Sequence, residues 1–144
     1  MAWTSNKPEK IVIHCAATPD RHQFTIKDID KWHKKRGWKS KSGIHCGYHW
    51  YIDFNGLIEQ GRPETETGAH VRGQNKNSIG ICLEGTWCFS QFQVESLIHL
   101  LKEIKSRSKI TANDIHCHYE FTDQKTCPNI SVHIIRKLFE LSLK

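Results

Sequence analysis

Apolar residues along the chain alternate between continuous β-branched runs and positions at helical spacing. Residues 10–17 read KIVIHCAA, and residues 78–83 read SIGICL. Continuous apolar runs of this length are typical of strands that are buried on both faces of a sheet. We therefore predict that the first segment is a central strand and that the second is also a strand.

Three further segments carry apolar residues at the spacing of an amphipathic helix. Thr25 begins a Thr-x-x-Asp capping box, and Gly37 provides a stop signal after an apolar face that includes Trp32. Residues 94–104 show the clearest helical periodicity, and residues 132–139 repeat it near the end of the chain. The pattern predicts three helices and places Trp32 in the core.

A hairpin and a short late strand complete the predicted elements. Residues 48–52 and 57–60 flank an Asn-Gly pair, which is a strong hairpin signal, and we predict a short strand near residues 115–118. Residues 61–77 are rich in glycine and poor in apolar side chains, so we predict a long functional loop there. Strands interleaved with helices predict an α/β fold, in which a central mixed β-sheet has helices packed on its faces.

Length and composition indicate one domain over residues 1–144, with its core at about 10–140. Hydrophobic residues make up 38% of the chain and charged residues 25%, which excludes a disordered or fibrous protein. No apolar run approaches the roughly 20 residues of a membrane span, and residues 1–8 lack the apolar core of a secretion signal. We expect no leader peptide and no membrane insertion, with a monomer as the default state.

The net charge of +6 favours a polyanionic partner such as nucleic acid, an acidic membrane or an anionic wall polymer. Basic residues surround Trp32 and Trp38, an arrangement that also occurs in single-strand nucleic-acid binders. Trp32 belongs to the predicted core, however, so these lysines are better interpreted as a solvated helix face. We expect no nucleic-acid partner.

Three side chains that can bind a metal ion fall at strand ends or in the loops that follow, where α/β sheets place their ligands. They are His14, His118 and Cys127. Two imidazoles and a thiolate form a zinc set with a fourth position open to water. The spacing alone is a weak signal because the chain has ten histidines, and His116 on the same strand face competes with His118.

A series of short motifs in a fixed order gives the chain a family resemblance. The series is IVIHCAAT from Ile11, GYHWYI from Gly47, Asn55-Gly56, Gly61-Arg62, GAH from Gly68, NSIGI from Asn77, HYE from His118 and KTCP from Lys125. Together these motifs resemble the zinc-dependent N-acetylmuramoyl-L-alanine amidases, which share a fold with the peptidoglycan recognition proteins. The similarity is greatest to short, single-domain phage endolysins.

The resemblance implies an enzyme that hydrolyses the amide bond between N-acetylmuramic acid and L-alanine in bacterial peptidoglycan with one Zn²⁺ ion. It makes His14, His118 and Cys127 the zinc ligands. It favours His118 over His116 because the family pattern is His-x-Glu followed by Lys-x-Cys-Pro.

The same resemblance makes Tyr48 and Lys125 the catalytic pair. Lys125 would stabilise negative charge on the carbonyl oxygen, and Tyr48 would orient the attacking water or transfer its proton. In another branch of the family a Glu occupies the strand position that is Cys82 here. Glu84, two residues further on, therefore stays an alternative to Tyr48 as the proton acceptor.

The long loop carries the candidate substrate contacts. His70 lies in a Gly-Ala-His segment that resembles part of a substrate groove, and Arg72, Asn75 and Asn77 are weaker candidates for the same groove. Asn77 also fits a simpler role, which is to turn the chain before the strand that follows.

Two alternatives concern the role of the protein. The fold also occurs in catalytically silent peptidoglycan-binding proteins, but those relatives typically lose a zinc ligand, and all three matching positions are present here. A leaderless wall hydrolase is expected to be made in the cytoplasm of a bacterial host and to act on the cell wall after release, as phage endolysins do. An enzyme of cytoplasmic wall recycling would carry the same features.

Overall fold

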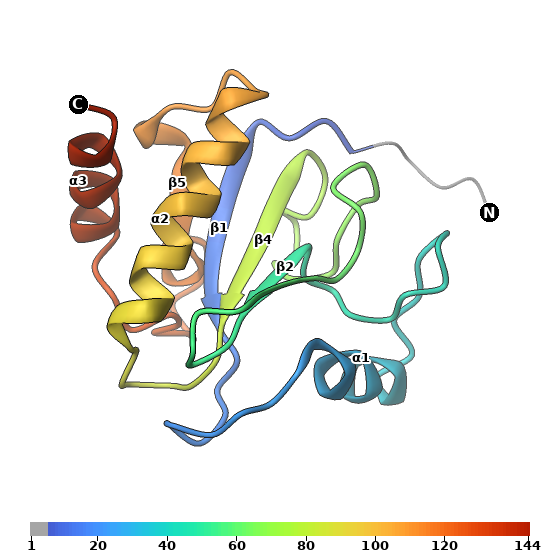
Figure 1. Cartoon of the computed structure of the whole chain (residues 1–144). Coiled ribbons are helices and arrows are strands. Elements are labelled where there is room, and N and C mark those ends of the chain that lie inside the picture. Colours follow the sequence, from blue (N-terminus) through green and yellow to red (C-terminus); the bar gives the residue numbers. More distant parts are fainter. Residues whose placement is uncertain (1–5) are drawn as a thin grey trace.

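A five-stranded sheet forms the centre of the computed structural model, which describes residues 6–144 (Figure 1). The strands are β1 (Lys10–Cys15), β2 (Trp50–Ile52), β3 (Ile58–Gln60), β4 (Ser78–Leu83) and β5 (Ile115–Cys117), in the spatial order β3-β2-β4-β1-β5. β1 pairs in parallel with β4 and β5, β2 pairs in parallel with β4, and β3 runs antiparallel to β2. The sheet is therefore mixed, as predicted.

Helices cover both faces of this sheet. The helices are α1 (Ile26–Lys35), α2 (Gln91–Ser106) and α3 (Val132–Ser142), and two 3₁₀ turns, η1 (Ala112–Asp114) and η2 (His118–Phe121), flank β5. α2 and α3 lie side by side on one face, and α1 lies on the other side of the sheet (Figure 1). Among the described residues, no helix is long and apolar enough to cross a membrane.

The parallel register of β1 and β4 separates an apolar face from a polar one. On one face Ile11 and Ile13 pack with Ile79 and Ile81 in the main core, beneath α2 and α3. The opposite face is less uniform, because the register sets Val12 beside Gly80 and His14 beside Cys82. This second face holds the side chains of the candidate site.

The predicted helix signals are found in α1. Asp28 Oδ2 accepts the Thr25 backbone N–H at 2.8 Å, which completes the capping box. Gly37 follows the helix with a φ of +78°, a left-handed conformation that glycine adopts without steric cost. Trp32 is partly buried and packs against the smaller core formed around Ile29 and Tyr51.

Four strand boundaries differ from the prediction, the smallest difference being that β3 begins at Ile58 rather than at Leu57. β1 ends at Cys15, and the positive φ of 58° at Ala17 shows that the chain has left the extended conformation there. The regular strand β2 begins at Trp50 rather than at Tyr48. β5 ends at Cys117, since the Glu120 carboxylate accepts the Cys117 backbone N–H at 3.0 Å and starts the turn η2 at His118.

The buried His33 on α1 makes the stability of the fold depend on pH. The residue is 6% exposed, and its Nδ1 accepts the Gly47 backbone N–H at 2.7 Å. Burial, followed by the charges of Arg36 and Arg62, lowers the pKa of His33 to about 4. The folded protein therefore keeps this imidazole neutral at pH values where an unfolded chain, with a pKa near about 6.5, protonates it.

We expect this difference to reduce stability on acidification. Because the unfolded state binds more protons than the folded state between about pH 6.5 and pH 4, the contribution of His33 is complete above pH 6.5 and declines as the pH falls. His33→Asn keeps an acceptor for Gly47 but cannot ionise. In urea unfolding from pH 7 to pH 4.5, its free energy of unfolding should fall less steeply than that of the wild type, by up to about 1.4 kcal/mol per pH unit. Equal slopes would contradict this assignment.

Candidate metal centre

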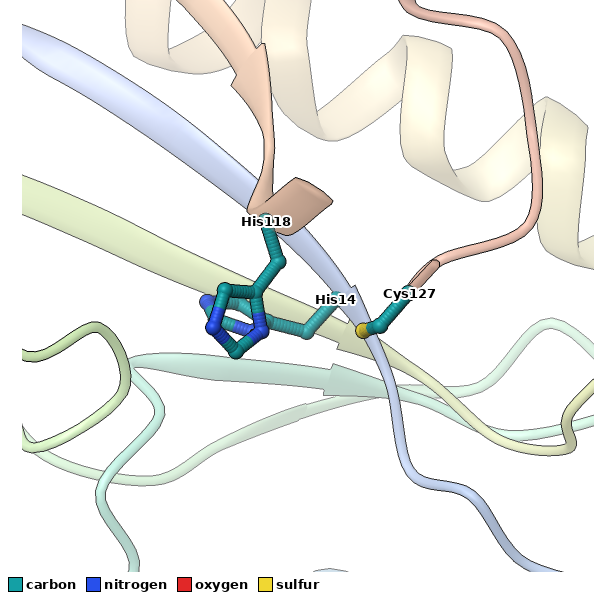
Figure 2. A group of neighbouring side chains, drawn as sticks. All are labelled: His14, His118 and Cys127. Atoms are coloured by element: carbon teal, nitrogen blue, oxygen red, sulfur yellow. The ribbon is translucent and has the colours of Figure 1, made fainter. Parts of the chain in front are cut away.

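Three potential metal ligands meet beside the end of β1. His14 is 1% exposed near the end of that strand, His118 opens η2, and Cys127 lies in the loop before α3. Their ligand atoms all lie within 4.8 Å of one another. Figure 2 shows the two imidazole rings next to each other, with the sulfur of Cys127 directed towards them. The structure thus brings together the three residues that the sequence predicted as ligands.

The distances and the donor types suit a tetrahedral zinc site. The Nδ1 atoms of His14 and His118 are 3.2 Å apart, close to the edge of about 3.3 Å that Zn–N bonds of about 2.05 Å imply for a tetrahedron. Cys127 Sγ accepts the Cys15 backbone N–H at 2.9 Å, a contact that favours a thiolate. Two imidazoles and one thiolate leave a fourth position for water or substrate.

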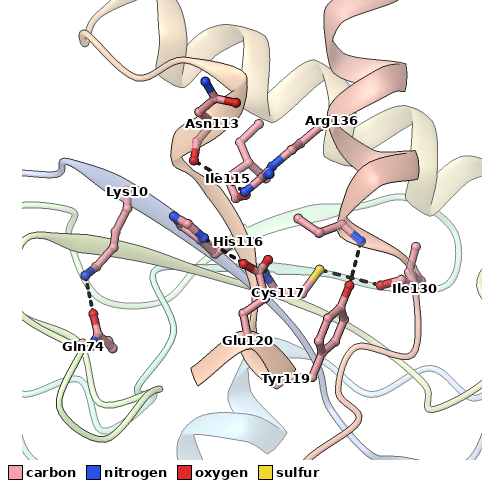
Figure 3. Close-up of polar contacts among 11 residues, drawn as sticks. Lys10, Gln74, Asn113, Ile115, His116, Cys117, Tyr119, Glu120, Ile130 and Arg136 are labelled. Carbon is pink, nitrogen blue, oxygen red and sulfur yellow. Dashed lines mark hydrogen bonds and ion pairs between the residues drawn. The ribbon is translucent and has the colours of Figure 1, made fainter. Parts of the chain in front are cut away.

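Hydrogen bonds to backbone groups hold the segment that carries His118 and Cys127. The Tyr119 N–H donates to the Cys127 carbonyl at 3.0 Å, which closes the loop between His118 and Cys127. The Tyr119 hydroxyl accepts the Val132 N–H at 2.8 Å, so the same residue anchors the loop to the start of α3 (Figure 3). Asn129 donates from Nδ2 to the carbonyl of Thr86 at 2.8 Å.

His116, the alternative to His118 as a metal ligand, contacts Glu120 instead of the cluster. His116 Nδ1 lies 3.1 Å from Oε2 of Glu120, and the other carboxylate oxygen accepts the Cys117 N–H (Figure 3). His116 is thereby occupied at the surface, while His118 faces His14. This geometry separates the two histidines, which sequence spacing alone left open.

The environment of the cluster favours the neutral form of both histidines. Burial, with the neighbouring imidazoles of His70 and His118, places the pKa of His14 well below its usual range. Burial and then Lys125 lower the pKa of His118. The adjacent Cys15 thiol and then burial raise the pKa of Cys127. Neutral imidazole is the form that binds a metal ion, and a bound cation would favour the Cys127 thiolate.

The two predicted catalytic side chains lie around this cluster. The ring of Tyr48 is 5.2 Å from that of His14, between centroids, and burial followed by the nearby thiols of Cys82 and Cys127 raises the pKa of Tyr48 well above its usual value. Its hydroxyl therefore stays protonated near neutral pH. Lys125 is exposed, and it lines a cavity of about 510 Å³ together with Trp87.

Glu84 is engaged elsewhere in the fold. The residue is fully buried, and its two carboxylate oxygens accept the backbone N–H groups of Phe24 and Phe54, the latter at 2.9 Å. These contacts hold the segments before α1 and after β2 against the sheet. They leave Glu84 in a supporting position.

The predicted groove residues lie in three different environments. Both ring nitrogens of His70 have partners, because Nδ1 lies 2.9 Å from His14 Nε2 and Nε2 lies 3.0 Å from Ser78 Oγ. Arg72 is exposed on the loop. Asn77 lies where β4 begins, at the opposite end of the strands from His14, and its side chain accepts the Lys7 N–H at 3.1 Å. Asn77 has a positive φ of 61°, as the turn interpretation requires.

Two residues of this region had no assigned role in the sequence analysis. Ser78 is fully buried and contacts His70, and a Cβ atom added at Gly80 would lie 2.6 Å from His70 Cγ. Gly80 therefore leaves the space in which the His70 ring lies. A glycine inside an otherwise apolar strand is the sequence signal for such a close approach.

Comparison with known proteins agrees with the geometry. Residues 4–130 match the family described as N-acetylmuramoyl-L-alanine amidase. The chain is 33% identical over 144 residues to the endolysin of Enterobacteria phage T3, covering 92% of this chain and 90% of the phage protein. The chain belongs to the N-acetylmuramoyl-L-alanine amidase family. The family and the class of enzyme predicted from the sequence are both confirmed.

Solved structures of this amidase fold superpose on nearly the whole chain. The N-acetylmuramoyl-L-alanine amidase LysC from Clostridium intestinale URNW matches with a TM-score of 0.80 and 33% identity, covering 97% of this chain and 93% of LysC. Drosophila PGRP-LB matches with a TM-score of 0.74 and 24% identity, covering 88% of this chain and 78% of its own. The second match shows that the chain shares its fold with a peptidoglycan recognition protein.

We expect Gly80→Ala to destabilise this amidase by about 1–3 kcal/mol, because the new methyl group overlaps the His70 ring. A double-mutant cycle in urea identifies the cause. Gly80→Ala should cost less in a His70→Ala background, where the ring is absent. Additive effects of the two substitutions would show that the overlap with His70 is not responsible.

Proposed function

We propose that this amidase is a zinc-dependent endolysin of phage type, whose single domain over residues 1–144 lyses bacterial cells by cleaving the bond between N-acetylmuramic acid and L-alanine. The observation that carries the proposal is the cluster of His14, His118 and Cys127, with Nδ1 atoms 3.2 Å apart and all ligand atoms within 4.8 Å. Peptidoglycan is the substrate of the family to which the chain belongs.

His14, His118 and Cys127 would hold one Zn²⁺ ion. When bound, such an ion supplies a Lewis acid beside the scissile carbonyl and lowers the pKa of a coordinated water towards about 7. The remaining chemistry depends on side chains around the cluster. Lys125, two positions before Cys127, carries a positive charge at the rim, where it stabilises the negative charge that develops on the carbonyl oxygen.

Tyr48 is the proposed partner of the attacking water. Its hydroxyl remains protonated, so it orients the water by hydrogen bonding and relays a proton to the departing L-alanine amine, receiving the proton of the water as it gives up its own, rather than acting as a phenolate base. Glu84 is the weaker candidate for this work, because both of its oxygens already accept backbone N–H groups.

Among the groove candidates, Arg72 is the proposed contact to the muramyl peptide, because its side chain is exposed on the loop between β3 and β4. His70 faces the metal cluster from the same loop. The contacts of Asn77 favour the turn role.

The lytic role is favoured over wall recycling by the likeness to a phage endolysin along most of both chains. Such an enzyme would be made in the host cytoplasm and would reach the wall after release. A silent peptidoglycan-binding protein is the other alternative. The complete ligand set argues against it.

Digestion of purified peptidoglycan tests the reaction. We expect zinc-loaded protein to release peptides with new L-alanine amino termini while the glycan strands stay intact, as measured by mass spectrometry. Cys127→Ser should abolish this release, because the thiolate ligand is lost. Cleaved glycan strands would contradict the amidase assignment. Wall binding without products would favour the silent binder.

His116 and His118 provide a matched test of which residues bind the zinc ion. We expect the wild type to retain about one zinc per chain after dialysis, the stoichiometry of a single three-ligand site, as measured by plasma mass spectrometry. His118→Ala should lose this zinc, whereas His116→Ala should keep it, because His116 contacts Glu120 instead. Loss of zinc in the His116 variant alone would overturn the assignment.

A further inference from the structure

A line of hydrogen bonds runs from the candidate metal ligand on β1 to the loop before β4. His14 Nε2 lies 2.9 Å from His70 Nδ1, and His70 Nε2 lies 3.0 Å from Ser78 Oγ. Ser78 Oγ lies 3.0 Å from the carbonyl oxygen of Asn75. The line ends at this backbone oxygen, which can only accept a hydrogen bond.

This fixed end determines the direction of every bond in the line. The Ser78 hydroxyl must donate to the Asn75 carbonyl, so Ser78 Oγ accepts from His70 Nε2–H. A neutral His70 then has a lone pair on Nδ1, which accepts from His14 Nε2–H. His14 in turn has its lone pair on Nδ1, the atom that lies 3.2 Å from His118 Nδ1.

The loop and strand hold His70 firmly in this line. Asn75 Oδ1 accepts the backbone N–H groups of His70 and Val71, at 2.7 and 2.8 Å, which closes the loop beneath the ring. Gly80 leaves the space for the ring on β4. The neighbouring His49 is already committed, because its Nδ1 accepts the Gly80 N–H at 3.0 Å and its Nε2 lies 2.7 Å from the Glu66 carbonyl.

We propose that His70 and Ser78 are positioning residues, which fix the tautomer and ring orientation of His14 so that its Nδ1 lone pair is presented to the metal ion. The proposal rests on the proposed zinc site and assigns to His70 a role within the protein rather than on the substrate. Outer partners of ligand histidines set ligand orientation and basicity, and their loss typically weakens metal binding by about 10- to 100-fold.

A matched pair of substitutions at position 70 provides the first test. The variant His70→Asn retains an acceptor oxygen near the place of Nδ1, whereas His70→Leu introduces a side chain of similar shape that has no acceptor. We expect His70→Leu to raise the zinc dissociation constant by about 10- to 100-fold in chelator competition, and His70→Asn to raise it clearly less. Equal dissociation constants for both variants and the wild type would overturn the proposal.

Ser78→Ala provides a second test if the Leu variant does not fold. It removes the acceptor for His70 Nε2–H and should raise the zinc dissociation constant by several-fold. Ser40→Ala is the matched control, because Ser40 is also buried and its hydroxyl donates to the Ile44 carbonyl at 2.8 Å, outside the line. We expect Ser40→Ala to bind zinc as the wild type does. An equal loss of affinity in the two serine variants would indicate a general effect of destabilisation and overturn the proposal.

Histidine ¹⁵N NMR spectra of the wild type report the tautomers directly. We expect both His14 and His70 to carry their proton on Nε2 in the zinc-loaded protein. A wild type that binds no zinc would refute the proposed function. Normal zinc binding with the proton of His70 on Nδ1 would refute this inference alone.

Discussion

The parallel pairing of β1 with β4 is the constraint on which the site depends. This register sets His14 beside Cys82 and Val12 beside Gly80, so a polar side chain and an empty space lie next to each other on one face of an otherwise apolar sheet. The space receives the ring of His70, and that ring supports the buried side of His14. A shift of the strand by one residue would turn His14 into the apolar core beneath α2 and α3.

The chemistry of the site depends on the imidazoles of His14 and His70 being buried in their neutral form. Burial lowers the pKa values of His14 and His70, and neighbouring imidazoles lower both further. Neutral rings can donate from one nitrogen and accept or bind a metal ion with the other. Lys125 differs because its side chain is exposed to solvent.

Much of the fold was predictable from local patterns. The capping box at Thr25, the β-branched run of β4 and the periodicity of α2 are readable because each signal lies within one element and reflects its local environment. Boundaries were less predictable, as the early end of β1 shows. A non-glycine residue with a positive φ, such as Ala17, is stabilised by its surroundings rather than by its own preference.

By itself the sequence determined the order of the elements, the family through its ordered motifs, and the three candidate ligands. Only the tertiary structure gave His116 its own partner in Glu120, committed Glu84 to backbone contacts, and joined His70 to His14 and Ser78. The physical reason is that a side chain's role depends on which partners reach its polar atoms. Those partners come from strands and loops far apart in the chain, and no local pattern specifies them.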